Sequence, residues 1–332
     1  MDYNGLNEII QRIYDNDNIL IPIHDKPDGD AVGSSTALAL FLKKLGKNCA
    51  VISPSAIPNR LAFAKNENVK YIEGVEKIDF SYDYIITVDV ASPELIGAVI
   101  AKLDKPISTV IDHHRVNTID AEFKYVDETA AAAGEIIFSL ISMYCMVTCA
   151  EIFDTEICEA LYTSISSDTG CFKYGNTTAE SYKIASQLMS VGINAEEINR
   201  LLFDTKSFKQ LKTEQLGIDK LELYCDGRLA VTCIDIADLE AIGASEEDTE
   251  TISQLARTVA GVQIGVMMRE KVFHDGKTGY KFSVRANSDT DVSALCAAFG
   301  GGGHKKAAGC TIYEDKKTAL DMFIKESEKY II

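Results

Sequence analysis

The sequence predicts an α/β protein with a doubly wound parallel sheet in its N-terminal part, a helical connector, and then a smaller α/β domain. Two observations indicate the parallel sheet. Short apolar segments of strand length alternate with segments of helical periodicity, a pattern typical of a parallel sheet with helices on both faces. Polar residues also follow several of the apolar segments directly, as expected where strands end at a ligand site.

The predicted elements begin with a helix and a strand. Apolar residues recur at helical spacing from Leu6 to Tyr14, and the apolar segment ILIPI (19–23) follows as a strand. The segment TALALFLKKLG (36–46) predicts a helix that ends at Gly46, because glycine readily adopts the left-handed conformation that follows a helix. Further strands are predicted at CAVIS (49–53), YIITVD (84–89) and STVID (108–112).

Residues 191–215 predict a helical connector between two domains. Asn194 is suited to cap a helix, and Glu197 stands three residues later, as in a capping box. We therefore assign residues 1–190 to a first domain and residues 216–332 to a second. Within the second domain, three apolar or alternating segments predict strands: 228–236, 261–270 and 280–287.

The composition argues against several classes of function. The net charge is −17, from 33 basic and 50 acidic residues, which disfavours binding to long duplex nucleic acid or to anionic membranes. The nine cysteines include no CxxC pair and fit a reducing compartment. The longest uncharged stretch, residues 136–150, is shorter than the ~20 apolar residues of a membrane span. We therefore expect a cytoplasmic protein with no membrane partner.

Carboxylates and imidazoles are concentrated in four short segments. They come from HDKPDGD, from the end of YIITVD, from DHH and from SSDTG: His24, Asp28, Asp30, Asp89, His113 and Asp168. Manganese and magnesium prefer carboxylate oxygens with an imidazole or two. Six such side chains are too many for one ion but suit two ions ~3.5–4 Å apart. A helix cap, a turn or a buried ion pair would explain each segment taken alone, so the prediction depends on their combination.

In the order HDKPDGDAVGS, ITVDVA, IDHHRVN and SSDTG, these segments resemble the motifs of the DHH phosphoesterase superfamily. A fifth segment, FGGGGHKKAAG (299–309), resembles the DHH-associated substrate-binding domain. The resemblance covers nearly the whole chain. It implies an enzyme that hydrolyses phosphodiesters and phosphomonoesters with two divalent metal ions, manganese being the expected metal.

The resemblance also implies a role for each matching residue of the first domain. The first ion would be bound by His24, Asp28 and Asp89. The second would be bound by Asp30, Asp89, His113 and Asp168, so that Asp89 bridges the two. Of the remaining residues of the DHH motif, His114 would contact the phosphate and help to protonate the leaving oxygen, and Asp112 would orient the histidines.

The glycine run of the second domain has two explanations. Its backbone N–H groups can form an anion-binding concavity because no side chains block the approach, but glycines alone fit a flexible loop equally well. The resemblance implies that Arg285 grips a substrate phosphate, and arginine suits this role because its planar fork donates two hydrogen bonds. The other substrate-binding residues that it implies are Gly301, Gly302, Gly303 and His304.

Size and charge indicate which members of the family the chain resembles. RecJ-type exonucleases carry an additional nucleic-acid-binding module, and family II pyrophosphatases have a different C-terminal domain. This two-domain chain most resembles the enzymes that hydrolyse short oligoribonucleotides (nanoRNA) and dephosphorylate 3′-phosphoadenosine 5′-phosphate (pAp). The expected partners are short single-stranded RNA or small nucleotides, since an acidic chain offers no long basic track for longer strands.

Two other functions remain open from the sequence. The same catalytic groups could hydrolyse a cyclic dinucleotide or its linear product, and the shape of the cleft would decide between these substrates. A nucleotide sensor that keeps the metal sites for affinity would bind without releasing mononucleotide. A homodimer is expected by analogy with the family alone.

Overall fold

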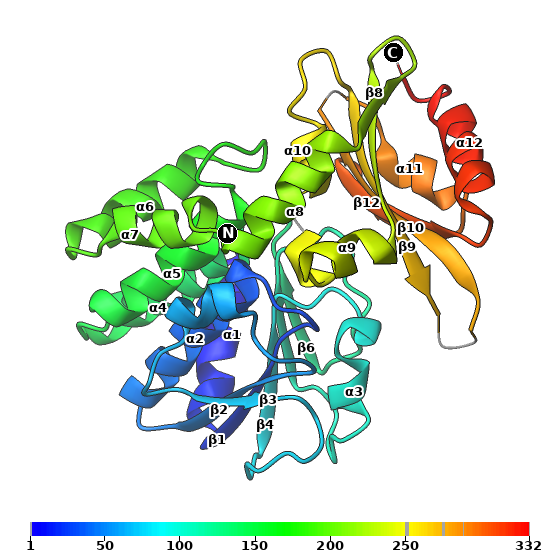
Figure 1. The fold of residues 1–332 in the computed structure, drawn as a ribbon. Helices are drawn as coiled ribbons and strands as arrows, with labels where there is room; N and C mark the ends of the chain where they lie inside the picture. Colours follow the sequence, from blue (N-terminus) through cyan, green and yellow to red (C-terminus); the bar gives the residue numbers. More distant parts are fainter. Residues whose placement is uncertain (1, 250–251, 274–275, 288, 332) are drawn as a thin grey trace. The chain divides into compact units, whose positions relative to one another are not determined.

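The computed structural model describes residues 2–249, 252–273, 276–287 and 289–331, apart from the side chains of Glu247 and His304. The chain forms two compact units, Met1–Thr205 and Lys206–Ile332 (Figure 1). The division falls within residues 191–215, where the sequence predicts a connector. These residues belong partly to each unit: α7 (Ala195–Asn199) and the π-helix η3 (Arg200–Asp204) lie in the first, and α8 (Phe208–Asp219) begins the second.

The first unit contains the predicted parallel sheet. Its six strands have the order β3-β2-β1-β4-β5-β6, and every neighbouring pair is parallel. The strands are β1 (Asn18–Pro22), β2 (Asn48–Ser53), β3 (Lys70–Glu73), β4 (Tyr84–Val88), β5 (Thr109–Asp112) and β6 (Phe123–Val126). The strand order reverses between β1 and β4, and ligands of doubly wound sheets bind beyond the carboxyl ends of the strands at such a reversal.

The central strands are apolar on both faces because helices or loops cover both. Ile19 and Ile21 of β1 point into the larger core of the first unit, whereas Leu20 between them belongs to a separate core on the opposite face. Successive side chains of a strand alternate between faces, so a strand buried on both sides becomes a continuous apolar run. This is why ILIPI and YIITV can be recognised in the sequence.

Helices α2 and α5 bring distant parts of the first unit together. The α-helices of this unit are α1 (Tyr3–Tyr14), α2 (Gly29–Lys44), α3 (Gly97–Ile100), α4 (Ala133–Thr148), α5 (Thr155–Asp168), α6 (Ala179–Ser190) and α7, with 3₁₀ turns η1 (Asn59–Ala64) and η2 (Pro93–Ile96). At Gly33, a Cβ atom would lie only 2.5 Å from the Ala160 carbonyl oxygen of α5. The absence of a side chain therefore allows the two helix backbones to approach closely.

The second unit contains a mixed sheet of order β11-β12-β10-β9-β8-β7, in which β8 and β9 are parallel and the other neighbours antiparallel. The strands are β7 (Leu221–Tyr224), β8 (Leu229–Ile234), β9 (Ile264–Val272), β10 (Thr278–Ala286), β11 (Gly302–His304) and β12 (Ala307–Ile312). The helical elements after α8 are α9 (Ile236–Ile242), the 3₁₀ turn η4 (Glu247–Thr249), α10 (Ile252–Ala256), α11 (Val292–Ala297) and α12 (Lys316–Ser327). The three strands predicted here correspond to β8, β9 and β10.

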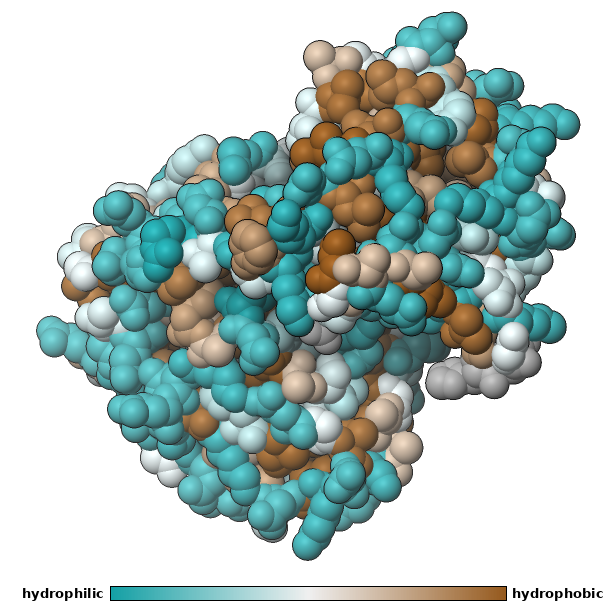
Figure 2. All heavy atoms as spheres, viewed as in Figure 1, coloured by the Kyte–Doolittle hydropathy of each residue, from teal (hydrophilic) through white to brown (hydrophobic). Residues whose placement is uncertain are grey.

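The surface visible in Figure 2 is mostly hydrophilic, with apolar side chains in scattered patches. This agrees with a chain in which 25% of the residues are charged. Scattered apolar residues on a surface are ordinary and by themselves indicate no ligand. Among the described residues, no helix has both the length and the apolar character needed to cross a bilayer.

Candidate metal centre

The loop after β1 places His24 and Asp28 beyond the carboxyl end of the sheet. Asp28 is the N-cap of α2: its Oδ1 accepts hydrogen bonds from the backbone N–H groups of Asp30 and Ala31, each at 3.0 Å. His24 Nδ1 lies 2.9 Å from the Asp25 carbonyl oxygen. A carbonyl can only accept, so Nδ1 carries a proton and Nε2 is the nitrogen available to a second proton or to a metal ion.

Asp89 follows β4 directly and is only 2% exposed. Its φ of +57° lies in the left-handed region, which aspartate and asparagine tolerate better than most residues. Asp89 Oδ2 is 3.7 Å from His24 Nε2, and Oδ1 is 3.5 Å from His113 Nε2. Oδ1 is buried and accepts no hydrogen bond from any residue that the structure describes. A buried carboxylate oxygen without a donor is costly unless a cation satisfies it.

The two adjacent histidines both lie beyond the sheet because β5 ends at Asp112, so strand alternation no longer separates their rings. Asp112 is fully buried, and its Oδ1 accepts the His113 backbone N–H at 2.9 Å and lies 2.8 Å from His114 Nδ1. The other oxygen accepts a hydrogen bond from Asn117 Nδ2 at 2.7 Å, and the same amide donates to the Val90 carbonyl. Asn117 therefore holds this loop in place.

His113 faces three carboxylates. Its Nδ1 lies 3.3 Å from the Ala130 carbonyl oxygen, which again leaves Nε2 available. Nε2 is 3.4 Å from Asp30 Oδ2, 3.5 Å from Asp89 Oδ1 and 3.8 Å from Asp168 Oδ2. These separations exceed the length of an N–H···O hydrogen bond, so the groups face one another without bonding directly.

Asp30 is held by two helices other than its own. Its carboxylate accepts the backbone N–H groups of Ala133 at 2.8 Å and Gly134 at 3.3 Å, at the N-terminus of α4, and the Ser164 hydroxyl of α5 also donates to it. Asp168, the last residue of α5, is held by Asn176, whose Nδ2 donates to the Asp168 carbonyl at 3.1 Å and to its Oδ2 at 3.3 Å.

Sequence reasoning missed Ser164 and Asn176. Ser164 stands within an apolar and small-residue run, and Asn176 stands in a turn rich in polar residues. Neither is a metal-ligand type in a recognisable spacing. Only the packing of α5 against α2 and α4 reveals their contacts.

The centre carries more negative charge than its imidazoles neutralise. Burial, together with the charges of Asp28 and Asp89, raises the pKa of Asp168 to about 7, although His113 opposes the shift. Burial and the charge of Asp89 likewise raise the pKa of Asp30 well above its usual range. Burial alone would lower the pKa of His24, but Asp28 and Asp89 outweigh it and raise that pKa to about 10. The raised pKa values of the two carboxyl groups and the raised pKa of the imidazole all indicate a site that favours added positive charge.

The six predicted ligands are thus brought together and fit divalent cations. Among the described residues, three groups have ligand atoms within 4.8 Å of one another: His24 with Asp28 and Asp89, Asp30 with His113 and Asp168, and Asp89 with His113 and His114. Asp89 is common to two groups and lies 3.5 Å from His113 of the remaining one. Carboxylate and imidazole ligands in this number suit two ions better than one.

The substrate-binding residues predicted in the second unit lie on neighbouring strands, except Gly301, which directly precedes β11. Arg285 of β10 is half-buried and opposes Ala307 of β12, which in turn opposes the backbone of His304 on β11. Arg285 donates from Nη1 to the Val284 carbonyl at 3.1 Å. The side chain of His304 lies outside the described part of the structure.

Two glycines of the run, Gly302 and Gly303, form most of the edge strand β11, and Gly300 and Gly301 precede it. Gly301 is required by packing, since a Cβ there would lie 2.2 Å from the Gly309 carbonyl oxygen. Gly303 has a φ of +144°, a conformation that favours glycine. At Gly302 there is open space for a side chain. Backbone constraints therefore account for at least two of these glycines independently of any ligand.

Comparison with known proteins agrees with this fold. Residues 18–165 match the N-terminal domain of the DHH family, and residues 229–331 match the DHHA1 domain. A parallel sheet with carboxylates and imidazoles clustered beyond its carboxyl edge is the expected architecture of a phosphoesterase of this class. The chain belongs to the DHH family.

Individual relatives cover most of the chain. It is 31% identical over 298 residues to the bifunctional oligoribonuclease and PAP phosphatase NrnA of Thermus thermophilus, an alignment covering 89% of this chain and 84% of that protein. It is 24% identical to NrnA of Bacillus subtilis, with coverage of 92% and 93%. An exopolyphosphatase-related protein from Bacteroides fragilis has a crystal structure that matches with a TM-score of 0.87 at 24% identity, covering 99% and 97% of the two chains. The last comparison shows a shared fold.

Proposed function

We propose that the chain hydrolyses short oligoribonucleotides to mononucleotides and removes the 3′-phosphate of pAp. The observation that carries the proposal is the convergence of four carboxylates and two imidazoles beyond β1, β4 and β5. The substrate class is supported by relatives named bifunctional oligoribonuclease and PAP phosphatase, which align over most of both chains. Two imidazoles among the ligands favour manganese over magnesium as the metal.

Six residues of the first unit are proposed to hold two divalent ions. We assign His24, Asp28 and Asp89 to one ion, and Asp30, Asp89, His113 and Asp168 to the other, with Asp89 shared. Bound there, two such ions would polarise a phosphoryl group and make an attacking water more acidic. These proposed ligands are oriented before an ion binds, because hydrogen bonds to backbone groups hold Asp28, Asp30 and both imidazoles.

The proposed catalytic contribution of the chain itself comes from His114. Its side chain is 26% exposed, so a substrate phosphate can reach it, and Asp112 holds its Nδ1 at 2.8 Å. The Asp112 carboxylate accepts, so Nδ1 carries a proton and the ring is fixed in one orientation. When Nε2 carries a second proton, the ring in that orientation can donate a hydrogen bond to a phosphate oxygen or give that proton to the leaving oxygen. Asp112 is a positioning residue because it acts through His114.

In the second unit, Arg285 is proposed to bind a substrate phosphate through its guanidinium fork, together with the backbone of residues 301–304. Replacing it with alanine is expected to raise the Michaelis constant for pAp roughly 10–100-fold, the loss of one charge-assisted contact. The turnover number and the manganese content should stay close to wild type. The matched control is Arg228→Ala, at another partly exposed arginine of the second unit. An unchanged Michaelis constant, or a loss of bound manganese, would contradict the assignment.

The test of the proposed function is a product time course with manganese on three substrates: the dinucleotide pApA, pAp and cyclic di-AMP. Consumption of the first two, with the cyclic compound intact, is the expected result. Opening of the cyclic compound at a comparable rate would identify a cyclic-dinucleotide phosphodiesterase instead. Binding of all three without release of mononucleotide or phosphate would overturn the enzymatic proposal in favour of a sensor.

We further propose a cytoplasmic homodimer whose partners are short single strands and small nucleotides rather than long duplexes. All nine cysteines are free, as suits a reducing compartment. The net charge of −17 opposes association with long polyanions. Light scattering of the full chain, and a titration with a labelled duplex at physiological salt, test the dimer and the absence of duplex binding.

A further inference from the structure

We propose that Asn176 and Glu135 are positioning residues of the metal centre. Both hold the backbone segment of residues 130–134, which leads into α4 and orients two of the proposed ligands, and Asn176 itself contacts a third. The inference rests on the proposed metal centre and extends it to two side chains that belong to none of the groups of candidate ligand atoms.

The 130–134 segment contacts two of the proposed ligands with its own backbone. The Ala130 carbonyl accepts a hydrogen bond from His113 Nδ1 at 3.3 Å, and this contact directs Nε2 toward the carboxylates. The N–H groups of Ala133 and Gly134 donate to the two oxygens of Asp30, at 2.8 and 3.3 Å. Any displacement of the segment would therefore turn the imidazole of one ligand and release the carboxylate of another.

Asn176 joins the segment to the third ligand. Its side-chain nitrogen, Nδ2, donates to the Ala131 carbonyl at 3.0 Å, to the Asp168 carbonyl at 3.1 Å and to Asp168 Oδ2 at 3.3 Å. A single amide thus connects the segment before α4 with the end of α5. An amide nitrogen only donates, so this contact positions Asp168 without competing for a cation.

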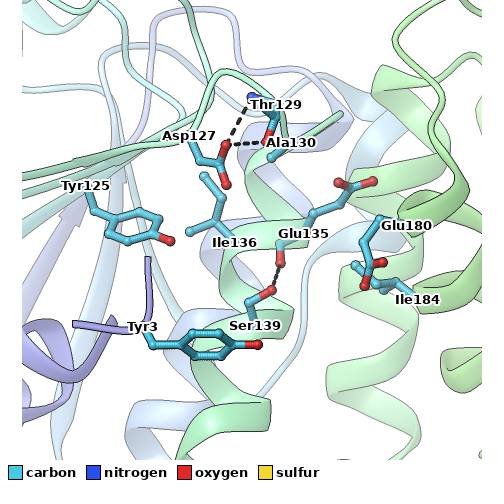
Figure 3. A pocket seen from close by; sticks show the side chains of 10 residues that line it. All are labelled: Tyr3, Tyr125, Asp127, Thr129, Ala130, Glu135, Ile136, Ser139, Glu180 and Ile184. Atoms are coloured by element: carbon cyan, nitrogen blue, oxygen red, sulfur yellow. Dashed lines mark hydrogen bonds between the residues drawn. The ribbon is translucent and has the colours of Figure 1, made fainter. Parts of the chain in front are cut away.

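Glu135, in the first turn of α4, forms a hydrogen bond with the same segment. The residue is 5% exposed, and its Oε2 accepts the Ala131 backbone N–H at 3.0 Å. Figure 3 shows the Glu135 side chain extending from the start of α4 beside Ala130, in the wall of a pocket of about 290 Å³. Its other oxygen, Oε1, is buried, and no described residue donates a hydrogen bond to it. Burying a carboxylate in this way is costly, and the backbone hydrogen bond that this carboxylate accepts comes from the segment.

Ala131 is consequently held at both of its backbone polar groups, the N–H by Glu135 and the C=O by Asn176. Ala130 before it contacts His113, and Ala133 and Gly134 after it contact Asp30. Groups that orient metal ligands typically contribute a factor of roughly 10–100 to metal affinity. We therefore expect each of these two side chains to contribute a factor of roughly 10–100 to the metal affinity.

The first test is Asn176→Ala, assayed by calorimetric titration of the metal-free, full-length protein with Mn²⁺ alone. The affinity for one of the two ions should fall roughly 10–100-fold, with an unchanged circular dichroism spectrum. The matched control is Asn194→Ala. It also removes an asparagine side-chain hydrogen bond, but one that caps α7 by accepting the Glu197 N–H at 3.1 Å. Its Mn²⁺ affinity should therefore stay close to that of the wild-type protein.

The second test separates the contact of Glu135 from its charge. Glu135→Gln keeps an oxygen that accepts the Ala131 N–H and should retain affinity near wild type, whereas Glu135→Ala should lose it. Asn176 is exposed, so its alanine variant decides the matter even where the buried Glu135→Ala change prevents folding. Wild-type affinity in Asn176→Ala would overturn the inference. Absence of Mn²⁺ binding by the wild-type protein itself would overturn the proposed metal centre instead.

Discussion

Replacing Asp89 by asparagine is expected to lower turnover with manganese by about 10³-fold or more, at least the loss seen when one preorganised electrostatic group is removed. Both proposed metal sites would lose a charged ligand, because the two carboxylate oxygens of Asp89 face His24 and His113 at 3.7 and 3.5 Å. Asparagine is preferred to alanine because the φ of +57° is tolerated by both aspartate and asparagine. The measurements are initial rates on pApA and the manganese content per chain.

The matched control lies at the other end of the same strand. Asp83 precedes β4 as Asp89 follows it, and its carboxylate accepts hydrogen bonds from the backbone and the side chain of Asn18, each at 3.0 Å. Asp83→Asn should alter stability slightly and leave turnover and manganese content unchanged. Asp89→Asn with two bound ions and near wild-type turnover would show that Asp89 is not the shared ligand.

The parallel sheet could be predicted because its central strands have a distinctive sequence pattern. Ile19, Leu20 and Ile21 are buried on alternate faces, so the strand is a short unbroken apolar run. The polar residues that follow such runs are placed by the topology of a parallel sheet, which brings all carboxyl ends to one edge. The meeting of His24, Asp89 and His113 could therefore be expected from the sequence alone.

The supports of the centre could not be predicted in the same way. The N–H groups of Ala133 and Gly134 reach Asp30 only because α4 begins beside α2, and Ser164 reaches it only because α5 packs on Gly33. Nearly every residue type has a backbone N–H group, so the sequence does not show which of these groups donate to Asp30. Gly301 and Gly303 show the converse: they belong to a recognisable pattern, but its structural cause, their close approach to β12, is not evident without the fold.

Adding manganese to the metal-free protein is expected to stabilise the first unit strongly. Without a cation, four carboxylates and two imidazoles are held together, and the described part of the chain provides no hydrogen-bond donor to the buried Asp89 Oδ1. The unfolded chain does not assemble these ligands, so binding energy becomes folding energy. Free Mn²⁺ at 100 times its dissociation constant contributes about 2.7 kcal/mol per site. Hydrogen exchange followed by mass spectrometry, with Mn²⁺ or with a chelator, measures this gain separately in each unit.

This prediction depends on which parts of the chain gain protection from hydrogen exchange when Mn²⁺ is added. Peptides from β4, β5 and the start of α4 should gain protection, whereas peptides from β9 and β10 of the second unit serve as the internal control and should not. Asp89→Asn should lose most of the gain, while Asp83→Asn should keep it, because only the first change removes a proposed ligand. Equal protection of both units would indicate general cation binding to an acidic protein, which a net charge of −17 also permits, and would contradict a specific centre. The distribution of protection therefore distinguishes a preorganised metal site from simple charge neutralisation, which the stability of the whole chain does not.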